Sequence, residues 1–300
     1  MSATVVVEAP AKVNLYLGVG AVRPDGYHSV ETVLQAVSLC DTLRLRSAAE
    51  LRLTCWPDLA VPDRDNLAWK AAERLAERLG RAPGVAIELS KLVPAGAGLG
   101  GGSSDAAAVL TGLAALWEID FANLAAEAAI AEIAAGLGAD VPFFLTGGTA
   151  LFWGRGDVLV RRLSAPRLDI VLVKPPDSVA TAATYAAFDR APVAATPPDA
   201  LLSACEAEDP EAVARALANN FEAVACGLVP DVADALAWLR RGKGVLGATV
   251  SGSGSAVFGV CADRAVAERA AADAQRRGWW SAAVQSRDTG VAVRLDEEAS

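Results

Sequence analysis

Residues 94–110 of this 300-residue chain read PAGAGLGGGSSDAAAVL, with five glycines between positions 96 and 102. Glycine loses more conformational freedom on folding than any other residue, so such a run is costly unless the backbone itself has a task. From Ser103 onward the sequence predicts a helix, because serines and an aspartate stand at its start and alanines follow. Glycines in front of a helix expose backbone N–H groups at its positive end, which favours anions. The stretch therefore predicts a phosphate-binding loop.

Two better-known phosphate loops fit this stretch poorly. The P-loop requires a lysine directly after its second glycine, and Gly102 occupies that position. The dinucleotide pattern G-x-G-x-x-G is present at Gly96, Gly98 and Gly101, but it requires a second parallel strand where this sequence predicts two successive helices. A glycine turn that only packs a helix against a sheet remains a second interpretation, although fewer glycines would suffice for it.

The composition describes a globular chain with a sizeable core. Hydrophobic residues make up 53% and charged residues 21% of the sequence, and the net charge is −9. A negative chain without a basic cluster disfavours nucleic acid as a partner. No apolar run reaches the roughly 18 residues of a membrane-spanning helix, and a basic leader is absent from the first residues. We therefore expect a cytoplasmic protein without a membrane or nucleic-acid partner.

The cysteine and histidine content argues against metal or triad chemistry. Five cysteines, widely spaced among apolar neighbours, predict free thiols in a reducing compartment. His28 is the single histidine, so a His/Cys metal site or a Ser-His-Asp triad is disfavoured. No protein ligand for a metal is assigned.

Hydrophobic periodicity predicts an α+β chain, long enough for one large or two ordinary domains, with a domain boundary between about residues 155 and 175. We expect residues 1–160 in a first domain and residues 161–300 in a second. A proline-rich segment over 191–204 precedes a helical region. The expected elements, in chain order, are strands over 4–10, 12–20, 28–39 and 41–47, a helix over 66–79, a strand over 84–94, helices from 103 and over 121–138, strands over 149–163 and 169–175, helices up to about 240, a glycine-serine cluster over 247–260, a helix over 263–278 and a strand over 291–295.

The glycine stretch also resembles the P-x-x-x-G-L-G-S/G-S-S/G-A phosphate loop of the GHMP kinases. Two further segments resemble that family in the family's order, APAKVNLYLGV at 9–19 and VSGSGSAVFG at 250–259. The resemblance implies a two-domain GHMP kinase fold, with a ribosomal protein S5 domain 2-like N-terminal domain and a ferredoxin-like α/β-plait C-terminal domain. It also implies ATP as the phosphate donor, Mg²⁺ as its companion, and an active site between the domains.

The resemblance implies that the glycine loop holds the ATP phosphates and that the late glycine motif lines the cleft near the substrate phosphates. Asp105 is expected as a first-turn charge of the helix rather than as a contact to Mg²⁺. The implied ATP-binding residues are Pro94, Ala95, Gly96, Gly98, Leu99, Gly100, Gly101, Gly102, Ser103 and Ser104, and the late motif supplies Ser251, Gly252, Ser253 and Gly254.

Asp140 and Lys12 are the catalytic candidates. From the residues alone, Asp140 in GADVPFF could equally cap a helix, and Lys12 could be a solvated surface lysine. By resemblance Asp140 accepts the proton of the acceptor hydroxyl, and Lys12 stabilises charge on the transferred phosphoryl group. Asn14 lies two residues after Lys12, on the same strand face, and is expected to orient the substrate.

The segment RPDGYHSV at 23–30 is similar to the branch of the family whose acceptor carries a cytidine diphosphate group. Tyr27 can stack on a planar base and His28 can hydrogen-bond to it, although a turn histidine without chemistry is the alternative from the residues alone. By resemblance, SVATAATY at 178–185 supplies Tyr185 on the other face of the cytosine and Thr181 as a further substrate contact.

The reaction implied by this branch is ATP-dependent phosphorylation of the 2-hydroxyl of diphosphocytidyl methylerythritol, in the non-mevalonate isoprenoid route. Two alternatives remain open. One is a GHMP kinase for another small alcohol, such as mevalonate or homoserine. The other is a nucleotide-binding module without catalysis, which would keep the glycine loop but could dispense with Lys12 and Asp140. The expected partner is a small molecule, and the oligomeric state is undetermined.

Overall fold

The computed structural model describes residues 4–119 and 124–296. Its N-terminal half contains the elements β1 (Thr4–Val22), β2 (His28–Ser47), β3 (Arg52–Trp56), η1 (Asp63–Asp65), α1 (Leu67–Arg78), β4 (Val85–Ser90), α2 (Gly101–Leu116), α3 (Leu124–Leu137), α4 (Val141–Thr146), β5 (Thr149–Trp153) and β6 (Val158–Leu163). The rest of the chain forms β7 (Asp169–Lys174), α5 (Thr181–Arg190), α6 (Asp199–Glu206), α7 (Pro210–Arg215), β8 (Ala218–Asn219), α8 (Glu222–Leu228), α9 (Pro230–Arg241), β9 (Val245–Val250), β10 (Val257–Cys261), α10 (Arg264–Arg276), β11 (Trp280–Gln285) and β12 (Ala292–Asp296).

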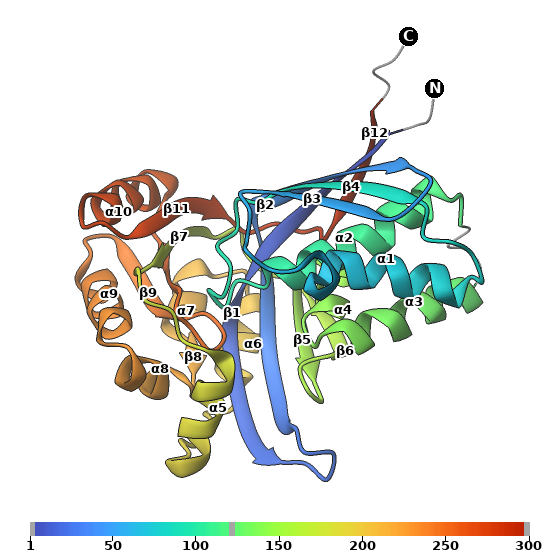
Figure 1. Ribbon diagram of the computed structural model, residues 1–300. Helices are drawn as coiled ribbons and strands as arrows, with labels where there is room; N and C mark the ends of the chain where they lie inside the picture. Colours follow the sequence, from blue (N-terminus) through green and yellow to red (C-terminus); the bar gives the residue numbers. More distant parts are fainter. Residues whose placement is uncertain (1–3, 120–123, 297–300) are drawn as a thin grey trace.

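A long antiparallel hairpin of β1 and β2 forms the spine between the two halves (Figure 1). The sequence predicted two separate strands for each of these segments, whereas each is one continuous strand. The pairing shifts register between Pro10 and Ala11, at the place where the prediction ended the first strand. A bulge accommodates a proline that cannot donate a ladder hydrogen bond, so the strand bends there instead of ending.

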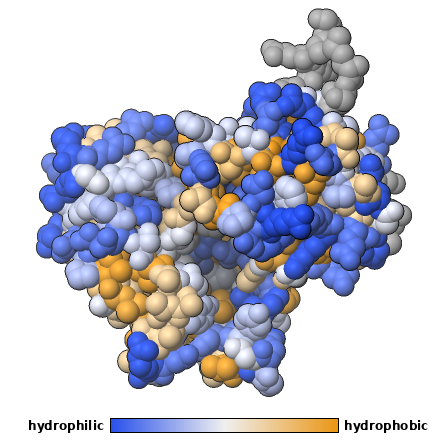
Figure 2. Space-filling model, in the orientation of Figure 1, coloured by the Kyte–Doolittle hydropathy of each residue, from blue (hydrophilic) through white to orange (hydrophobic). Residues whose placement is uncertain are grey.

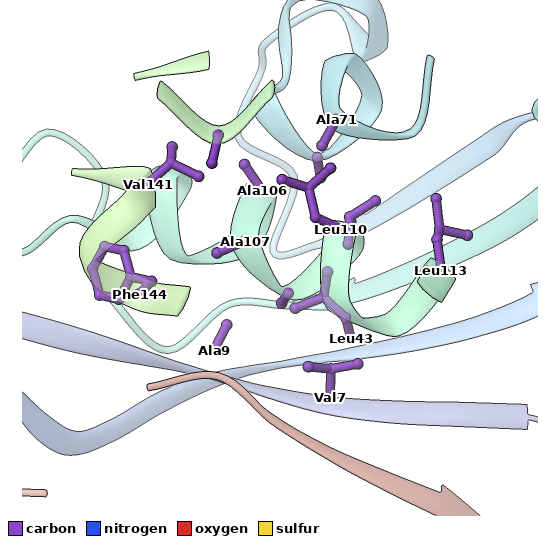
Figure 3. Close-up of a cluster of buried hydrophobic side chains, with 14 of the residues drawn as sticks. Val7, Ala9, Leu43, Ala71, Ala106, Ala107, Leu110, Leu113, Val141 and Phe144 are labelled. Atoms are coloured by element: carbon purple, nitrogen blue, oxygen red, sulfur yellow. The ribbon is translucent and has the colours of Figure 1, made fainter. Parts of the chain in front are cut away.

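The first sheet has the order β12-β1-β2-β4-β3, and β5, β6 and β8 extend it along the far part of the hairpin. Helix α2 lies across this sheet, with α1 and α4 packed against it (Figure 3). Its alanines make the close approach possible: Ala106 and Ala107 are fully buried, in the same core as Val7 of β1 and Leu43 of β2.

The second sheet has the order β11-β7-β10-β9 and is antiparallel throughout. Successive side chains of β7 point to opposite faces of the sheet, so they pack in two different cores. Val171 and Val173 pack against α9 and α10, whereas Ile170 and Leu172 pack in the core that includes Val13 of β1. The second sheet is therefore held directly against the hairpin.

Helix α2 begins at Gly101, two residues before the predicted start. The prediction was placed at Ser103 because serine is a good cap, but the N-cap position is taken by Gly100 in the left-handed region, with φ of 73°. Two glycines of the loop thus form the first turn of the helix. Their N–H groups belong to the helix end that favours anions.

Two strands from the C-terminal half complete the first sheet. In the register, β12 pairs Asp296 with Thr4, and β8 pairs Ala218 with Tyr16. The division into domains at residue 160 stays a prediction. Both strands lie after that residue and pair with β1, which lies before it.

Within residues 4–119 and 124–296, no helix combines the length and apolarity needed to cross a membrane. Hydrophilic residues cover most of the face in Figure 2, including the outer surface of α10.

Candidate active site

Lys12 is buried in β1, with only 3% of its surface exposed. Its Nζ donates a hydrogen bond to Oδ1 of Asn14 at 2.8 Å, and Nδ2 of Asn14 donates to Oγ1 of Thr32 in β2 at 2.9 Å. The register shift between Asn14 and Tyr16 follows immediately, so the polar side chains stand at an irregular point of the sheet. A solvated surface lysine is therefore not what the structure contains.

Asp140 precedes α4 at the N-cap position, but its side chain caps no backbone N–H. Instead its Oδ2 lies 3.4 Å from Nζ of Lys12, and about one third of the side chain is exposed. The structure thus brings together the two residues that the sequence proposed as a pair. The carboxylate remains accessible to a ligand, while the ammonium behind it is desolvated.

The glycine loop lies between β1 and the late glycine motif. The N–H of Lys12 donates to the carbonyl of Leu99 at 3.0 Å, and Oγ of Ser251 donates to the carbonyl of Gly98 at 2.9 Å. Gly98 has φ of 77°, and a Cβ on it would lie 2.2 Å from the carbonyl oxygen of Ser251. Gly100 has no more room, since a Cβ there would lie 2.7 Å from the ring of Phe144. Both positions require glycine for conformation and for space.

The late glycine motif is a fixed turn rather than a flexible one. Oγ of Ser253 lies 3.0 Å from Oγ1 of Thr181, at the start of α5. Nδ2 of Asn219 donates to the carbonyls of Val250 and Gly252, each at 2.8 Å. The sequence does not predict this role for Asn219, because an asparagine in a helical region carries no signal that it will hold a distant turn.

A pocket of about 260 Å³ collects these elements. Of the predicted site residues, those that line it are Lys12, Asn14, Gly98, Ser103, Asp140, Thr181, Tyr185, Gly252 and Ser253. Residues that were not predicted also line it, among them Thr32, Arg155, Gly156 and Phe221. Arg155 stands between two glycines in WGRGD, and that turn-like spacing was the available signal.

The remaining predicted residues lie behind or beside the pocket. Leu99 is buried in the core under the hairpin, and the hydroxyl of Ser104 is buried without a hydrogen-bond partner. Those outside the pocket lining are Pro94, Ala95, Gly96, Leu99, Gly100, Gly101, Gly102, Ser104, Ser251, Gly254, Tyr27 and His28.

His28 borders a larger groove of about 1230 Å³, which shares Val30 with the first pocket. Its Nδ1 donates to the carbonyl of Gly20 at 2.8 Å, and its Nε2 lies 3.0 Å from Oδ1 of Asp189. The ring centroid of Tyr185 is 5.1 Å from that of His28. Burial raises the pKa of Tyr185 above its ordinary value, with Asp140 adding to the effect. Tyr27, at the tip of the hairpin, is 56% exposed.

A buried charge cluster lies beneath the glycine loop. Nζ of Lys91 bonds to Oδ2 of Asp105 at 2.6 Å and also to Oδ2 of Asp41. Burial would lower the pKa of Lys91, but the charges of Asp105 and Asp41 outweigh it and raise that pKa. Burial raises the pKa of Asp105 to about 7, although Lys91 opposes the rise. The expectation of a first-turn charge was wrong for Asp105, because the helix turns this residue inward onto Lys91.

The sequence predicted buried free thiols, and the structure buries Cys205 and Cys261, whereas Cys40, Cys55 and Cys226 are half-buried. All five are free thiols, and burial raises the pKa of Cys205 to about 11 and that of Cys261 to about 12. Thiols with such pKa values are inert at neutral pH. Within residues 4–119 and 124–296, the side chains of His, Cys, Asp and Glu form no group of three or more suited to a metal ion.

The fold and the pocket together describe a small-molecule kinase, and known proteins agree. The family model for the N-terminal domain of GHMP kinases matches residues 66–148, and that for their C-terminal domain matches residues 201–278. The chain belongs to the GHMP kinases, and it has their two-domain mixed α/β fold and uses ATP as phosphate donor.

Within that class, the chain belongs to the 4-diphosphocytidyl-2-C-methyl-D-erythritol kinase family. It is 44% identical to the enzyme of that name from Nocardia farcinica over 275 residues, covering 88% of this chain and 87% of the relative. It is 42% identical to the enzyme from Gloeobacter violaceus over 273 residues, covering 88% of each. A crystal structure of 4-(cytidine 5'-diphospho)-2C-methyl-D-erythritol kinase superposes with a TM-score of 0.77 at 36% identity, over 94% of this chain and 98% of the other. Homoserine kinase from Cytophaga hutchinsonii shares the fold, with a TM-score of 0.75 at 21% identity over 97% of each chain.

Proposed function

We propose that this protein transfers the γ-phosphoryl group of ATP to the 2-hydroxyl of 4-diphosphocytidyl-2-C-methyl-D-erythritol, in the non-mevalonate isoprenoid route of the cytoplasm. The observation that carries the proposal is the Lys12–Asp140 pair, with its 3.4 Å separation, in one pocket with the glycine loop. Relatives that bear the name of this kinase support the choice of acceptor.

Asp140 accepts the proton of the acceptor hydroxyl as the phosphoryl group is transferred. Its carboxylate is about one third exposed, which suits that task, and the buried ammonium of Lys12 lies 3.4 Å from it. Lys12 also stabilises the charge that spreads over the transferring oxygens. Asn14 fixes the ammonium from one side and orients the acceptor from the other.

Backbone N–H groups of the loop and of the first turn of α2 hold the ATP phosphates, so the loop needs no lysine of its own. Pro94 and Ala95 lead into the loop, the residues proposed to hold the phosphates are Gly96, Gly98, Leu99, Gly100, Gly101, Gly102, Ser103 and Ser104, and Ser251, Gly252, Ser253 and Gly254 close the site from the C-terminal half.

The pocket fits a Mg²⁺ ion that arrives with ATP. Mg²⁺ commonly takes one or two protein oxygens and fills its other positions with phosphates and water. The carboxylate of Asp140 and the hydroxyl of Ser103 line the pocket and are the oxygens that would hold it. The ion would neutralise charge on the β- and γ-phosphates.

The acceptor is held by its base. Tyr27 stacks on the cytosine from the exposed tip of the hairpin, Tyr185 covers the other face, and His28 hydrogen-bonds to its edge. Thr181 contacts the substrate near Ser253. The ring of Tyr27 is exposed in the free protein and is therefore open for stacking on the cytosine base.

The test is to incubate the protein with Mg²⁺ and ATP and with each acceptor in turn, following ADP release and new phosphorus resonances. We expect turnover with 4-diphosphocytidyl-2-C-methyl-D-erythritol. Turnover with mevalonate or homoserine alone would replace the proposed acceptor. ATP binding without turnover on any acceptor would leave a nucleotide-binding module.

A further inference from the structure

The pocket holds one cation whose task is not yet assigned. Among its lining residues, positive charge comes from Lys12 and Arg155 and negative charge from Asp140. The ammonium of Lys12 is already engaged by Asn14 and Asp140. Two anionic substrates must be accommodated, so Arg155 is the cation left for the acceptor.

Arg155 is held rigidly along one edge of its guanidinium. Its Nε and Nη2 donate to Oδ2 of Asp157 at 2.9 and 2.6 Å, and its backbone N–H donates to Oδ1 of the same residue at 2.9 Å. Nη2 also donates to the carbonyl of Ala135 in α3 at 3.1 Å. The hydrogen bond with Asp157 raises the pKa of Arg155, so the group stays charged. The side-chain hydrogen bonds to Asp157 and Ala135 run from Nε and Nη2, the guanidinium also interacts with the side chain of Tyr27, and 31% of the side chain is exposed.

Arg155 also lies at the junction of the base site and the reaction site. Its guanidinium carbon is 5.1 Å from the ring centroid of Tyr27, the residue proposed to stack on the base. The same side chain lines the pocket that contains Lys12 and Asp140. The acceptor has three parts in a row, which are a base, a diphosphate and a sugar alcohol. A group that touches Tyr27 and faces the reacting pair therefore lies beside the middle part.

We infer that Arg155 binds the diphosphate of the acceptor through the Nη1 side of its guanidinium, which the hydrogen bonds to Asp157 and Ala135 do not use, and is a specificity residue for a nucleoside-diphosphate acceptor. This inference rests on the proposed function. Arginine held by a carboxylate on one edge keeps a planar donor edge for phosphate on the other. Because Asp157 offsets part of the positive charge, the contribution to binding is moderate.

The first test is steady-state kinetics of Arg155→Met with 4-diphosphocytidyl-2-C-methyl-D-erythritol. One charged hydrogen bond corresponds to an increase in acceptor KM of about 10- to 100-fold. The KM for ATP and kcat should stay close to wild type. Arg155→Lys should recover part of the loss, because a point charge survives without the planar fork. Arg161→Met, which removes an exposed arginine paired with Glu206 outside the pocket, is the matched control.

The second test separates contact with the diphosphate from support of Tyr27. Cytidine 5'-diphosphate and cytidine are compared as inhibitors competing with the acceptor. Arg155→Met should weaken inhibition by the diphosphate about tenfold or more and leave that by cytidine unchanged. Equal weakening of both inhibitors would mean that Arg155 only positions Tyr27, and this would overturn the inference. A higher KM for ATP with an unchanged acceptor KM would overturn it as well.

The two proposals fail in different ways. If the wild-type protein does not phosphorylate this acceptor, the proposed function fails before any variant is compared. If the wild-type protein turns over and Arg155→Met keeps its acceptor KM, only the role of Arg155 is lost. Thermal unfolding of each variant checks that the turn between β5 and β6 has kept its structure.

Discussion

Nζ of Lys12 lies 3.4 Å from Oδ2 of Asp140, although one residue stands in β1 and the other at the start of α4. The pair is asymmetric, since the ammonium is buried and the carboxylate is about one third exposed. An acid that faces the ligand and a cation that stands behind it suit proton acceptance next to a developing negative charge.

Replacement of the acid should remove turnover without unfolding the protein. We expect Asp140→Ala to lower kcat by about 10²- to 10⁴-fold, because the acceptor hydroxyl loses its proton acceptor. The KM for ATP should change little. Asp199→Ala, at the exposed start of α6, serves as control for the loss of an aspartate at a helix start. Near wild-type turnover in Asp140→Ala would reduce Asp140 to a helix-start residue.

Removal of the cation should also spare the fold. Lys12→Met fills most of the same buried volume and relieves the desolvation of a charge, so the free energy of unfolding should not fall greatly. The value of kcat should fall on the order of 10²- to 10³-fold, as when one electrostatic stabiliser of a transition state is lost. Single-turnover rates with saturating ATP measure this step directly. An unchanged rate would assign the charge stabilisation to another group.

The contact between the glycine loop and the late motif can be tested by adding one methyl group. Gly98→Ala places a Cβ 2.2 Å from the carbonyl oxygen of Ser251 in a left-handed conformation, so the loop must shift. We expect an ATP KM at least about tenfold higher. Gly80→Ala is the matched control, since Gly80 has φ of 62° and no atom within 4 Å of the added Cβ. Equal effects in both variants would point to backbone strain alone.

The buried Asp105 should leave a signature in the pH dependence of stability. Its pKa is about 7 in the folded protein and 3.8 as a free group, so the folded state binds more protons between these values. Stability due to this group therefore falls as pH rises from about 4 to about 7, by at most about 4 kcal/mol, and is level above that range. The unfolding free energy of Asp105→Asn minus that of wild type should thus rise over this window. Urea titrations measure it, with the exposed Asp288→Asn as a flat control.

Local patterns in the sequence were enough to predict most elements, because hydrophobic period and turn residues act over short distances. Helix α1 begins one residue after its predicted start and ends one residue early. The continuity of β1 through Pro10 could not be predicted, since it depends on a bulge opposite a strand elsewhere in the chain. The addition of β8 and β12 to the first sheet is likewise a long-range pairing that no local pattern specifies.

The motifs were enough to propose that Lys12 pairs with Asp140 and that this pair lies beside the glycine loop. The supporting contacts could not. Asn219, Arg155 and Lys91 act through carbonyls and carboxylates that only the tertiary structure brings near. Such side chains look like ordinary surface residues in a sequence, because nothing in their neighbours records a distant partner.

The hydrogen bond from Ser251 to Gly98 ties ATP occupancy to the docking of the C-terminal half. A fragment of residues 1–160 would carry every residue of the glycine loop and still lack Ser251, β8 and β12. By thermodynamic linkage, any ligand that orders this loop also strengthens the attachment of the second sheet. ATP alone should therefore slow amide exchange in β9 and β10, and Ser251→Ala should abolish this effect of ATP.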